Sequence, residues 1–427
     1  MGILLSKSHF IKDHKWFLLS LLCNLIIHLI LGLIYYNPVD FVLQFEAAKK
    51  IAQGQLLYRD IGQFITDDVE LPKPQYPPLY LYTLGFVIAI IGVEKFTWQM
   101  AKLFLIIFNL IVGFLVYQIV LDHVHSHPKS NILALASMNW FLLNPSTLGV
   151  IFGGYHENFM LFFVLLGIIM FKKTHYSLVG VCFGLALLVK PIACIYMLPL
   201  LVWGVQTRNV KSIVIWIGAG FTFLIGSLPF LLLSPEEYLN DVFLIHTQRP
   251  DPSMSFFTYF LTDISTTLFP FIIQLVIFGL YFLLFIKKIT VTNSKEVIGA
   301  ILPFMTIFMA LNRILYPHYV PFFFPFFTFS LFILGAECYG YTKFEKINLF
   351  LVVLLIGLFL VYLGSISWSF LWSIEKYETY LYNPLFSVSA IIFIVGLITI
   401  SVTSLYSLYY LGKEKSQTNN WKYSLHS

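Results

Sequence analysis

The chain has 427 residues, of which 59% are hydrophobic and 11% are charged, and its formal net charge is +5. Soluble domains carry roughly a quarter charged residues, so this composition excludes a soluble protein and predicts a polytopic membrane protein. The positive charge needs no nucleic-acid partner, because its distribution along the chain follows the expected membrane topology. The cysteines are scattered through the apolar segments and form neither a disulfide framework nor a CxxC metal motif; they are Cys23, Cys182, Cys194 and Cys338.

The first apolar run, residues 16–36, follows a basic flank, as the core of a signal peptide would. It is too long for such a core and no A-x-A cleavage pattern follows it, so we expect a retained first helix. The fold class is therefore all-α, with about twelve transmembrane helices in one integral membrane domain. The expected spans are 16–36, 98–121, 131–150, 156–171, 175–189, 191–206, 211–233, 264–286, 297–312, 318–337, 347–369 and 384–410.

The segment "YPPLYLY" at 76–82 decides the topology. The run that it opens, 78–93, is short for a span, and two adjacent prolines suit a helix start. If 78–93 lies on the outer face without crossing, 16 of the 26 Lys and Arg residues fall inside and 10 outside. The positive-inside rule favours this arrangement, which places both termini in the cytoplasm and 78–93 in a juxtamembrane helix.

A long outer loop, 37–97, follows from this topology. Within it, "DFVLQFEAAKKIAQG" predicts an amphipathic helix that ends at Gly54, and "ITDDVELPKPQ" predicts irregular structure. On the opposite side, "HVHSH" at 123–127 fits either an exposed loop or a metal site, and we favour the loop.

The unusual ionisable residues gather at the outer ends of the spans, where charged groups at membrane depth are costly and are usually functional. A carboxylate there can act as a general base, and cations can hold a phosphate and stabilise it as a leaving group. The candidates are Asp40, Asp60, His156, Glu157, Lys190, His246, Arg249, Arg313 and His318, with Tyr76 beside them.

Structural explanations remain open for several of these residues. Asp40 can serve as a helix N-cap, and His156 with Glu157 can form an interfacial polar pair. The Lys190 side chain can reach lipid headgroups, and Arg249 can lie in a hydrophilic loop. The case for a site rests on their occurrence together on one side.

Several motifs resemble the GT-C glycosyltransferases, polytopic enzymes that use polyprenyl-phosphate sugars as donors. The pattern D-x4-F-x2-A-x3-A-x-G-x3-Y-x-D runs from Asp40 to Asp60 and is followed by "YPPL". "NPSTLGVIFGGYHENF" and "LVGVCFGLALLVKPIACIY" resemble later motifs of that family. The resemblance covers residues 16–260 and implies a catalytic module there that includes loop 37–97, with a variable helical module at 261–427.

The resemblance also implies roles for the candidate residues. Asp40 would be the catalytic base, while His156, Glu157, Asp60 and Tyr76 would form the acceptor or second polar site. Donor phosphate would be held by Lys190, His246, Arg249, Arg313 and His318. The second outer loop departs from many relatives, because it carries His-Glu where they carry Asp. Asp40 also stands alone instead of in an acidic pair, so we expect no metal or other cofactor.

The expected function is inverting transfer of a hexose, mannose or glucose, from a polyprenyl-phosphate donor to a lipid-linked glycan or another cell-surface acceptor. The expected location is a prokaryotic plasma membrane in preference to the ER membrane, with membrane lipids as further partners. A transporter or lipid-glycan flippase is the alternative, although such proteins usually show related halves with broken helices. A catalytically inactive binding protein of the same fold is a second alternative.

Overall fold

The structure is a computed structural model that describes residues 7–34, 39–60, 64–66, 69–71, 76–244, 269–312, 319–334, 336, 344–374 and 384–424. The predicted all-α class is confirmed. The first half contains α1 (Lys7–Leu33), α2 (Val39–Ala52), α3 (Leu79–Ile91), α4 (Trp98–Val124), α5 (Ser130–Leu142), α6 (Pro145–Gly153), α7 (Glu157–Lys172), α8 (Tyr176–Leu187), the 3-10 helix η1 (Pro191–Met197) and α9 (Leu198–Thr207). The second half contains α10 (Lys211–Leu233), α11 (Pro235–Leu239), a π-helical turn (Asn240–Leu244), α15 (Phe269–Lys288), α16 (Ser294–Leu311), α17 (Val320–Phe329), a π-helical turn (Ser330–Leu334), α19 (Phe344–Ile374) and α20 (Pro384–Ser424).

Five helices in the described residues are long and apolar enough to cross a membrane. They are Lys15–Leu33, Trp98–Val124, Lys211–Leu233, Ser294–Leu311 and Leu385–Tyr409. Shorter apolar helices accompany them, including Tyr176–Leu187 and Val320–Ile333. A multi-pass membrane protein is therefore confirmed, whereas the count of twelve spans stays a prediction.

The expected span at 131–150 is not one continuous helix, because the chain is broken there into α5 and α6. Pro145 disfavours helical backbone at the residue before it, and Asn144 is extended, with φ −64° and ψ 135°. The Asn144 side chain accepts a hydrogen bond from the Ser146 amide and so caps α6. The break lets α6 take its own direction toward the end of the bundle.

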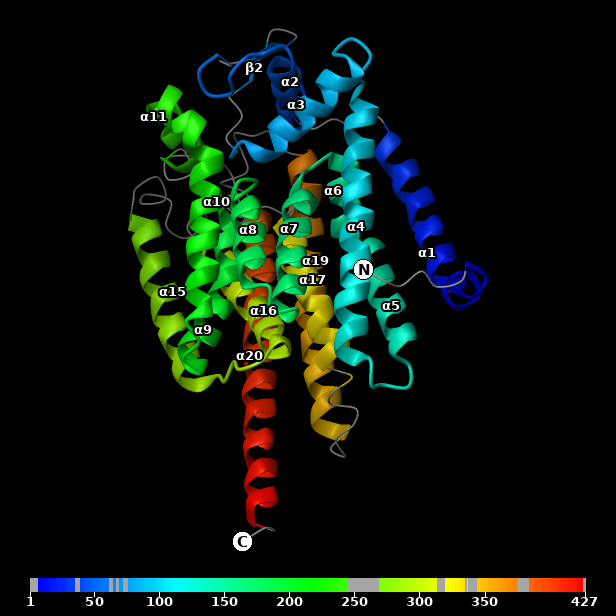
Figure 1. The fold of residues 1–427 in the computed structure, drawn as a ribbon, viewed down its shortest axis with the longest axis vertical. Helices are drawn as coiled ribbons and strands as arrows, with labels where there is room; N and C mark the ends of the chain where they lie inside the picture. Colours follow the sequence, from blue (N-terminus) through cyan, green and yellow to red (C-terminus); the bar gives the residue numbers. More distant parts are fainter. Residues whose placement is uncertain are drawn as a thin grey trace.

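The disputed segment forms α3, a helix of 13 residues that begins directly after Pro78. At a rise of about 1.5 Å per residue it spans roughly 20 Å, which is short of a hydrocarbon core of about 30 Å. It lies across one end of the bundle together with α2 (Figure 1). Its backbone is anchored where the Leu79 amide donates to the Leu188 carbonyl at 3.0 Å. The expectation that 78–93 does not cross the membrane is therefore consistent with the structure.

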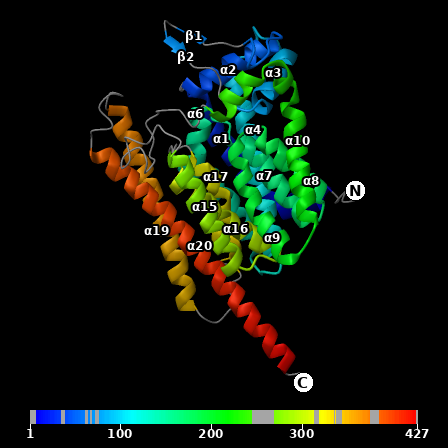
Figure 2. The same ribbon diagram turned by 90° about the vertical axis from the view of Figure 1, so that its left-hand side faces the viewer.

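The stretch predicted to be irregular contains a small hairpin instead. Strands β1 (Phe64–Thr66) and β2 (Val69–Leu71) pair antiparallel, with Phe64 opposite Leu71 and Thr66 opposite Val69. Apolar and β-branched residues in both short runs favour this pairing. The hairpin lies at the same end as α2 and α3 (Figures 1 and 2).

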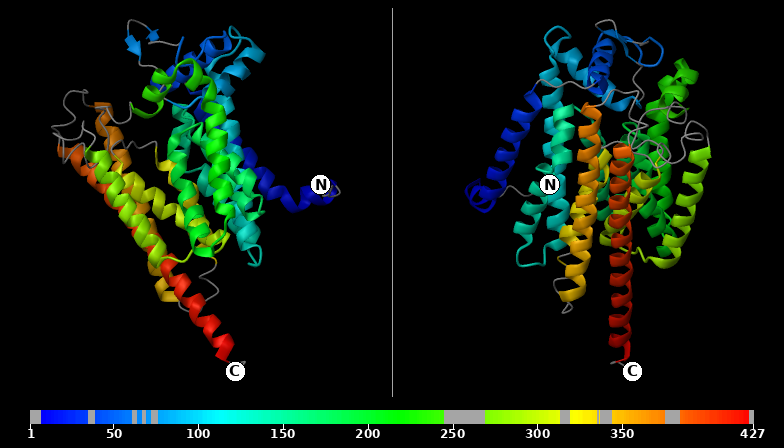
Figure 3. Two further views of the ribbon diagram at one scale, coloured as in Figure 1. Left: turned by 60° about the vertical axis from the view of Figure 1, so that its left-hand side comes forward. Right: turned by 180° about the vertical axis from the view of Figure 1, so that it is seen from behind.

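The remaining helices form a bundle beneath α2 and α3. Helices α19 and α20 lie side by side along one flank, and the C-terminal part of α20 extends past the opposite end of the bundle (Figures 2 and 3). On another flank, α1 carries exposed apolar side chains such as Leu22, Ile26 and Ile30. These surfaces suit a lipid environment and leave the α2–α3 end as the place where polar residues gather.

The contact between α2 and α3 gives a first prediction. A Cβ atom on Gly85 would lie 2.9 Å from Ile51 Cγ2 and 3.1 Å from the Ala48 carbonyl oxygen, so Gly85→Ala should push the two helices apart. Overpacking of this kind costs about 1–3 kcal/mol, so we expect a lower Tm in a thermal unfolding measurement. Gly220→Ala is the control, because a Cβ there meets nothing within 4 Å; equal behaviour of the two variants would contradict the prediction.

Candidate active site

The α6–α7 turn positions the first candidate carboxylate. Helix α6 ends at Gly154, which has φ 68° and so favours glycine. A Cβ atom there would also lie 2.4 Å from the Phe41 ring of α2. Helix α7 then begins at Glu157, whose charge suits the positive end of the helix dipole. Both Glu157 and the preceding His156 are buried.

The break between α8 and η1 positions Lys190. Pro191 follows it and forces extended backbone at Lys190, with φ −149° and ψ 130°. The Lys190 Nζ donates to Glu157 Oε1 at 2.5 Å, and the two side chains are only 9% and 1% exposed. Two residues that the sequence placed at neighbouring span ends are thus joined in a buried ion pair.

Aromatic rings surround the Lys190 ammonium. Its Nζ lies 5.1 Å from the ring centroid of Tyr76, 5.3 Å from Phe322 and 5.8 Å from Tyr319. Ring faces attract a cation, more strongly when the cation is desolvated. Because Phe322 lies in α17 and Tyr319 directly precedes that helix, the C-terminal half of the chain contributes to this site.

His156 links the ion pair to α2. Its Nδ1 donates to Gln44 Oε1 at 3.0 Å. Its ring stacks on Tyr80 at 4.6 Å and meets Tyr76 edge to face at 4.8 Å. Burial raises the pKa of the Tyr80 hydroxyl, and the nearby Glu157 carboxylate raises it further, so Tyr80 stays neutral.

Within the described part of the chain, several buried polar atoms here have no hydrogen-bond partner; they are Gln44 Nε2, the Tyr80 hydroxyl and Glu157 Oε2. Buried polar groups are nearly always satisfied by protein, water or ligand. A group of such atoms around one ion pair therefore points to a place where a polar molecule binds.

Asp40 lies in the first turn of α2, one helical turn before Gln44. Residues four apart share one face of a helix, so Asp40 and Gln44, which bonds His156, lie on the same face of α2. The Asp40 side chain is partly exposed. Among the described residues nothing forms a hydrogen bond or ion pair with its carboxylate. Since α2 begins at Val39, Asp40 is inside the helix and is not its N-cap.

Tyr58 fixes the segment that carries Tyr76. Its hydroxyl donates to the Tyr76 carbonyl at 2.6 Å, and its ring meets Tyr238 and Phe230 edge to face. Burial raises the pKa of Tyr58, with further contributions from Tyr238 and Asp241, so the hydroxyl remains a donor. The structure thus buries Tyr58 as a support for Tyr76.

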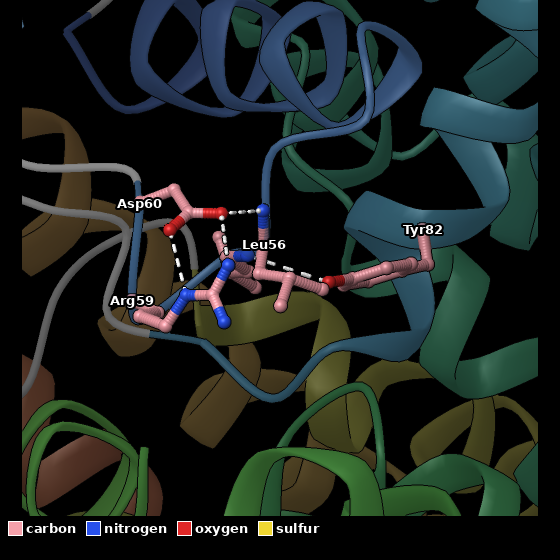
Figure 4. Close-up of polar contacts among 5 residues, drawn as sticks. Leu56, Arg59, Asp60 and Tyr82 are labelled. Carbon is pink, nitrogen blue, oxygen red and sulfur yellow. Dashed lines mark hydrogen bonds and ion pairs between the residues drawn. The ribbon is translucent and has the colours of Figure 1, made fainter. Parts of the chain in front are cut away.

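Asp60 forms a local turn with Leu56 and Arg59 (Figure 4). Its carboxylate accepts from the Leu56 amide at 2.8 Å and from Arg59 Nε at 2.8 Å. Arg59 lowers the pKa of Asp60, and the Leu56 amide lowers it further. Tyr82 also joins this turn, because its hydroxyl accepts a hydrogen bond from the Leu57 amide at 3.3 Å. A carboxylate with a lowered pKa, such as that of Asp60, is a weaker base.

Four predicted donor-binding residues, His246, Arg249, Arg313 and His318, lie outside the described residues. The sequence reasoning missed two residues of the site, Gln44 and Tyr80. Gln44 could have been found from its spacing of four from Asp40. Tyr80 follows the Pro77–Pro78 pair, but its contact with His156 is a feature of the fold alone.

The histidines of "HVHSH" do not converge. His123 is buried and its Nδ1 donates to the Ile119 carbonyl at 2.7 Å, while His125 and His127 lie at the following turn. In the part of the chain that the structure describes, no three His, Cys, Asp or Glu side chains are grouped as metal ligands. Metal independence itself stays a prediction.

An apolar pocket of about 280 Å³ adjoins the site. It lies between the start of α3 and the ends of α8 and α10, and Leu188 in its wall is two residues from Lys190. Beside it, α10 exposes Leu224, Leu228 and Leu232 on its outer face. The pocket is lined by Leu56, Pro78, Leu79, Tyr82, Leu188, Gly226, Pro229 and Phe230.

Known proteins share sequence with this chain over its central part. Residues 80–287 match the family model of glycosyltransferase family 87. GPI mannosyltransferase 1 of Saccharomyces cerevisiae is 23% identical over 219 residues, which cover 48% of this chain and 53% of the relative. The chain thus spans about half the length of this curated relative.

Two solved structures of ArnT from Cupriavidus metallidurans also align with the chain. The structure bound to undecaprenyl phosphate is 14% identical, with a TM-score of 0.48 over 95% of this chain and 79% of ArnT. The apo structure is 12% identical, with a TM-score of 0.49 over 93% and 78%.

The predicted resemblance to glycosyltransferases is confirmed over residues 80–287 by the family match. The glycosyltransferase family 87 region contains Tyr80, His156, Glu157 and Lys190 and the α8–α10 side of the pocket. Asp40 and the pocket residues Leu56, Pro78 and Leu79 precede it.

The buried ion pair gives a second prediction. Glu157→Gln or Lys190→Met alone leaves an unpaired buried charge, which costs about 3–5 kcal/mol of stability. The Tm of each single variant should therefore fall strongly. The double variant should be more stable than the sum of the single losses predicts. The matched control is the Glu46–Lys49 pair, 3.3 Å apart and much more exposed, where the same changes cost under about 1 kcal/mol. Additive losses at Glu157 and Lys190 would contradict the prediction.

Proposed function

We propose that this protein is an inverting glycosyltransferase that moves a hexose from a polyprenyl-phosphate donor to the hydroxyl of a lipid-linked or cell-surface glycan. The observation that supports it most is the buried Glu157–Lys190 pair, beside which His156 bonds Gln44 of α2, one helical turn after Asp40. Mannose is the first hexose to test, since the curated relative is named a mannosyltransferase.

Asp40 acts as the general base in this proposal. Its carboxylate takes the proton of the acceptor hydroxyl while that oxygen attacks C1 of the sugar. The bond from C1 to the phosphate oxygen breaks, the phosphate leaves with the electron pair, and the anomeric centre inverts. A partly exposed carboxylate that has no partner among the described residues is suited to this step, whereas Asp60 is held by Arg59 and its pKa is lowered.

The donor head group binds beside the ion pair. Lys190 uses one donor for Glu157, and an ammonium has three, so further donors can meet a phosphate oxygen. His246, Arg249, Arg313 and His318 remain candidates for the same phosphate. The unpartnered Tyr80 hydroxyl and Gln44 amide supply polar groups for hydroxyls of the bound ligand.

The apolar pocket holds the first isoprene units of the donor. It lies next to Lys190 in the chain and beside the apolar outer face of α10, so a lipid tail reaches it sideways from the bilayer. The α2–α3 end then faces the lumen or the cell exterior, with both termini in the cytoplasm. We place the protein in a prokaryotic plasma membrane in preference to the ER membrane.

The third prediction tests the base. Asp40→Asn removes the proton acceptor but keeps the shape of the side chain, so transfer should fall at least about 100-fold, the size of a general-base contribution. The measurement is transfer of radiolabel from a panel of polyprenyl-phosphate hexoses to extracted membrane lipids, in nanodiscs. Asp60→Asn is the control and should retain most activity. Unchanged activity in Asp40→Asn would exclude Asp40 as the base.

The fourth prediction tests the pocket. Leu56→Trp fills part of it without touching the ion pair. The KM for a long-chain polyprenyl-phosphate hexose should rise, because its tail loses apolar contact, while the KM for a two-isoprene donor should change little. An equal rise for both donors would place the lipid tail elsewhere.

A further inference from the structure

Three helices each bring a buried polar side chain to one point in the bundle. His28 lies in α1, Asn109 in α4 and Asn158 in α7, and all three are buried. A polar side chain is costly in an apolar interior unless it is hydrogen-bonded. No role in transfer has been assigned to any of them above.

Their hydrogen bonds run in one direction. His28 Nδ1 donates to the Asn24 carbonyl at 2.7 Å, so the proton of the neutral ring is on Nδ1. His28 Nε2 then accepts from Asn109 Nδ2 at 2.6 Å. Asn109 Oδ1 in turn accepts from Asn158 Nδ2 at 2.6 Å. The chain of donors therefore leads from α7 through α4 to α1.

One end of this network is next to Glu157 in the chain, and the other lies in the helix that precedes Asp40. Asn158 directly follows Glu157 in the first turn of α7. His28 lies near the end of α1, and Asp40 stands twelve residues later in α2. The last turn of α1 packs closely on α4, since a Cβ atom on Gly32 would lie 2.7 Å from Ile106 Cδ1.

Apolar packing alone holds α1 weakly. Much of its apolar surface is exposed, as at Leu22, Ile26 and Ile30, and lipid tails replace such contacts at little cost. Hydrogen bonds, by contrast, fix both the rotation of a helix about its axis and its position along that axis. The position of α1 in the bundle therefore depends on the polar contacts.

We propose that His28, Asn109 and Asn158 are positioning residues that set the placement of Asp40 relative to Glu157 and Lys190. They act by tying α1, which leads into α2, to the first turn of α7. This inference rests on the function proposed above for Asp40 and the ion pair. The purely structural alternative is that the network only holds α1 in the bundle.

A second polar contact on α1 provides a matched control. Ser20 Oγ donates to Asn139 Oδ1 of α5 at 2.6 Å, which also attaches α1 to the bundle. Ser20 is eight residues before His28, roughly 12 Å farther from the α2 end at about 1.5 Å per residue. Ser20→Ala therefore weakens the attachment of α1 but keeps the His28, Asn109 and Asn158 side chains and the hydrogen bonds between them.

The test compares His28→Leu, His28→Gln and Ser20→Ala in nanodiscs. One measurement is kcat and KM with polyprenyl-phosphate mannose, and the other is hydrogen exchange of the amides in α2 and in the first turn of α7. His28→Leu should lower kcat at least about tenfold with little change in KM, because misplacing a group by about 1 Å costs up to about 100-fold. Its α2 amides should exchange faster.

His28→Gln should recover much of the lost kcat and much of the lost protection of the α2 amides. The reason is that a glutamine amide offers a donor and an acceptor in place of the ring. Ser20→Ala should leave kcat and α2 exchange unchanged, even if Tm falls. Unchanged α2 exchange in His28→Leu would overturn the proposal. The proposal would also be overturned if His28→Leu and Ser20→Ala lost kcat and Tm to the same extent. If wild type transfers no sugar, the proposed function fails, while hydrogen exchange still decides whether the network positions α2.

Discussion

The contact between Glu157 and Lys190 constrains the rest of the site. Their charges meet at 2.5 Å, almost fully buried, where either charge alone would be costly. The pair therefore requires the start of α7 and the α8–η1 break to stay together. Pro191 and Gly154 make that possible, because one extends the backbone at Lys190 and the other turns the chain into α7. The rings of Tyr76, Tyr319 and Phe322 then close around the ammonium.

The α2–α3 layer is built on this pair by polar contacts. His156 bonds Gln44 of α2, Tyr58 bonds the Tyr76 carbonyl, and the Leu79 amide bonds the Leu188 carbonyl. The contacts of His156 and Leu188 join the layer to two different parts of the bundle, whereas the Tyr58 contact fixes the loop within the layer. In a membrane, apolar contact between helices is weakly specific, because lipid offers the same contact. Directional hydrogen bonds are what can hold a carboxylate such as Asp40 at a defined place.

Composition and local pattern predicted the helical class and the short helix after Pro77–Pro78, because hydropathy, proline and charge bias act within a few residues. They also indicated that Glu157 and Lys190 are unusual as charged residues at span ends. They did not indicate that the two form an ion pair, since the ion pair depends on how α7 and α8 pack. The break at Asn144 could have been predicted from Pro145, whereas the β1–β2 hairpin consists of two runs of only three residues. His28, Asn109 and Asn158 were overlooked because each is a single uncharged polar residue in an apolar run, and their meaning appears only when three helices meet.

The two sides of the site differ in a way that suits a lipid-linked substrate. On the side of α1 and α7, buried polar groups are connected from helix to helix, so this side is ordered by hydrogen bonds. On the side of α10, the apolar pocket adjoins exposed leucines, so shape and apolar contact alone define it. A polyprenyl tail varies in conformation and needs only an apolar surface, whereas the reacting atoms need fixed geometry. The boundary between the two sides passes Lys190, and that is where the phosphate of such a donor would join its tail to its sugar.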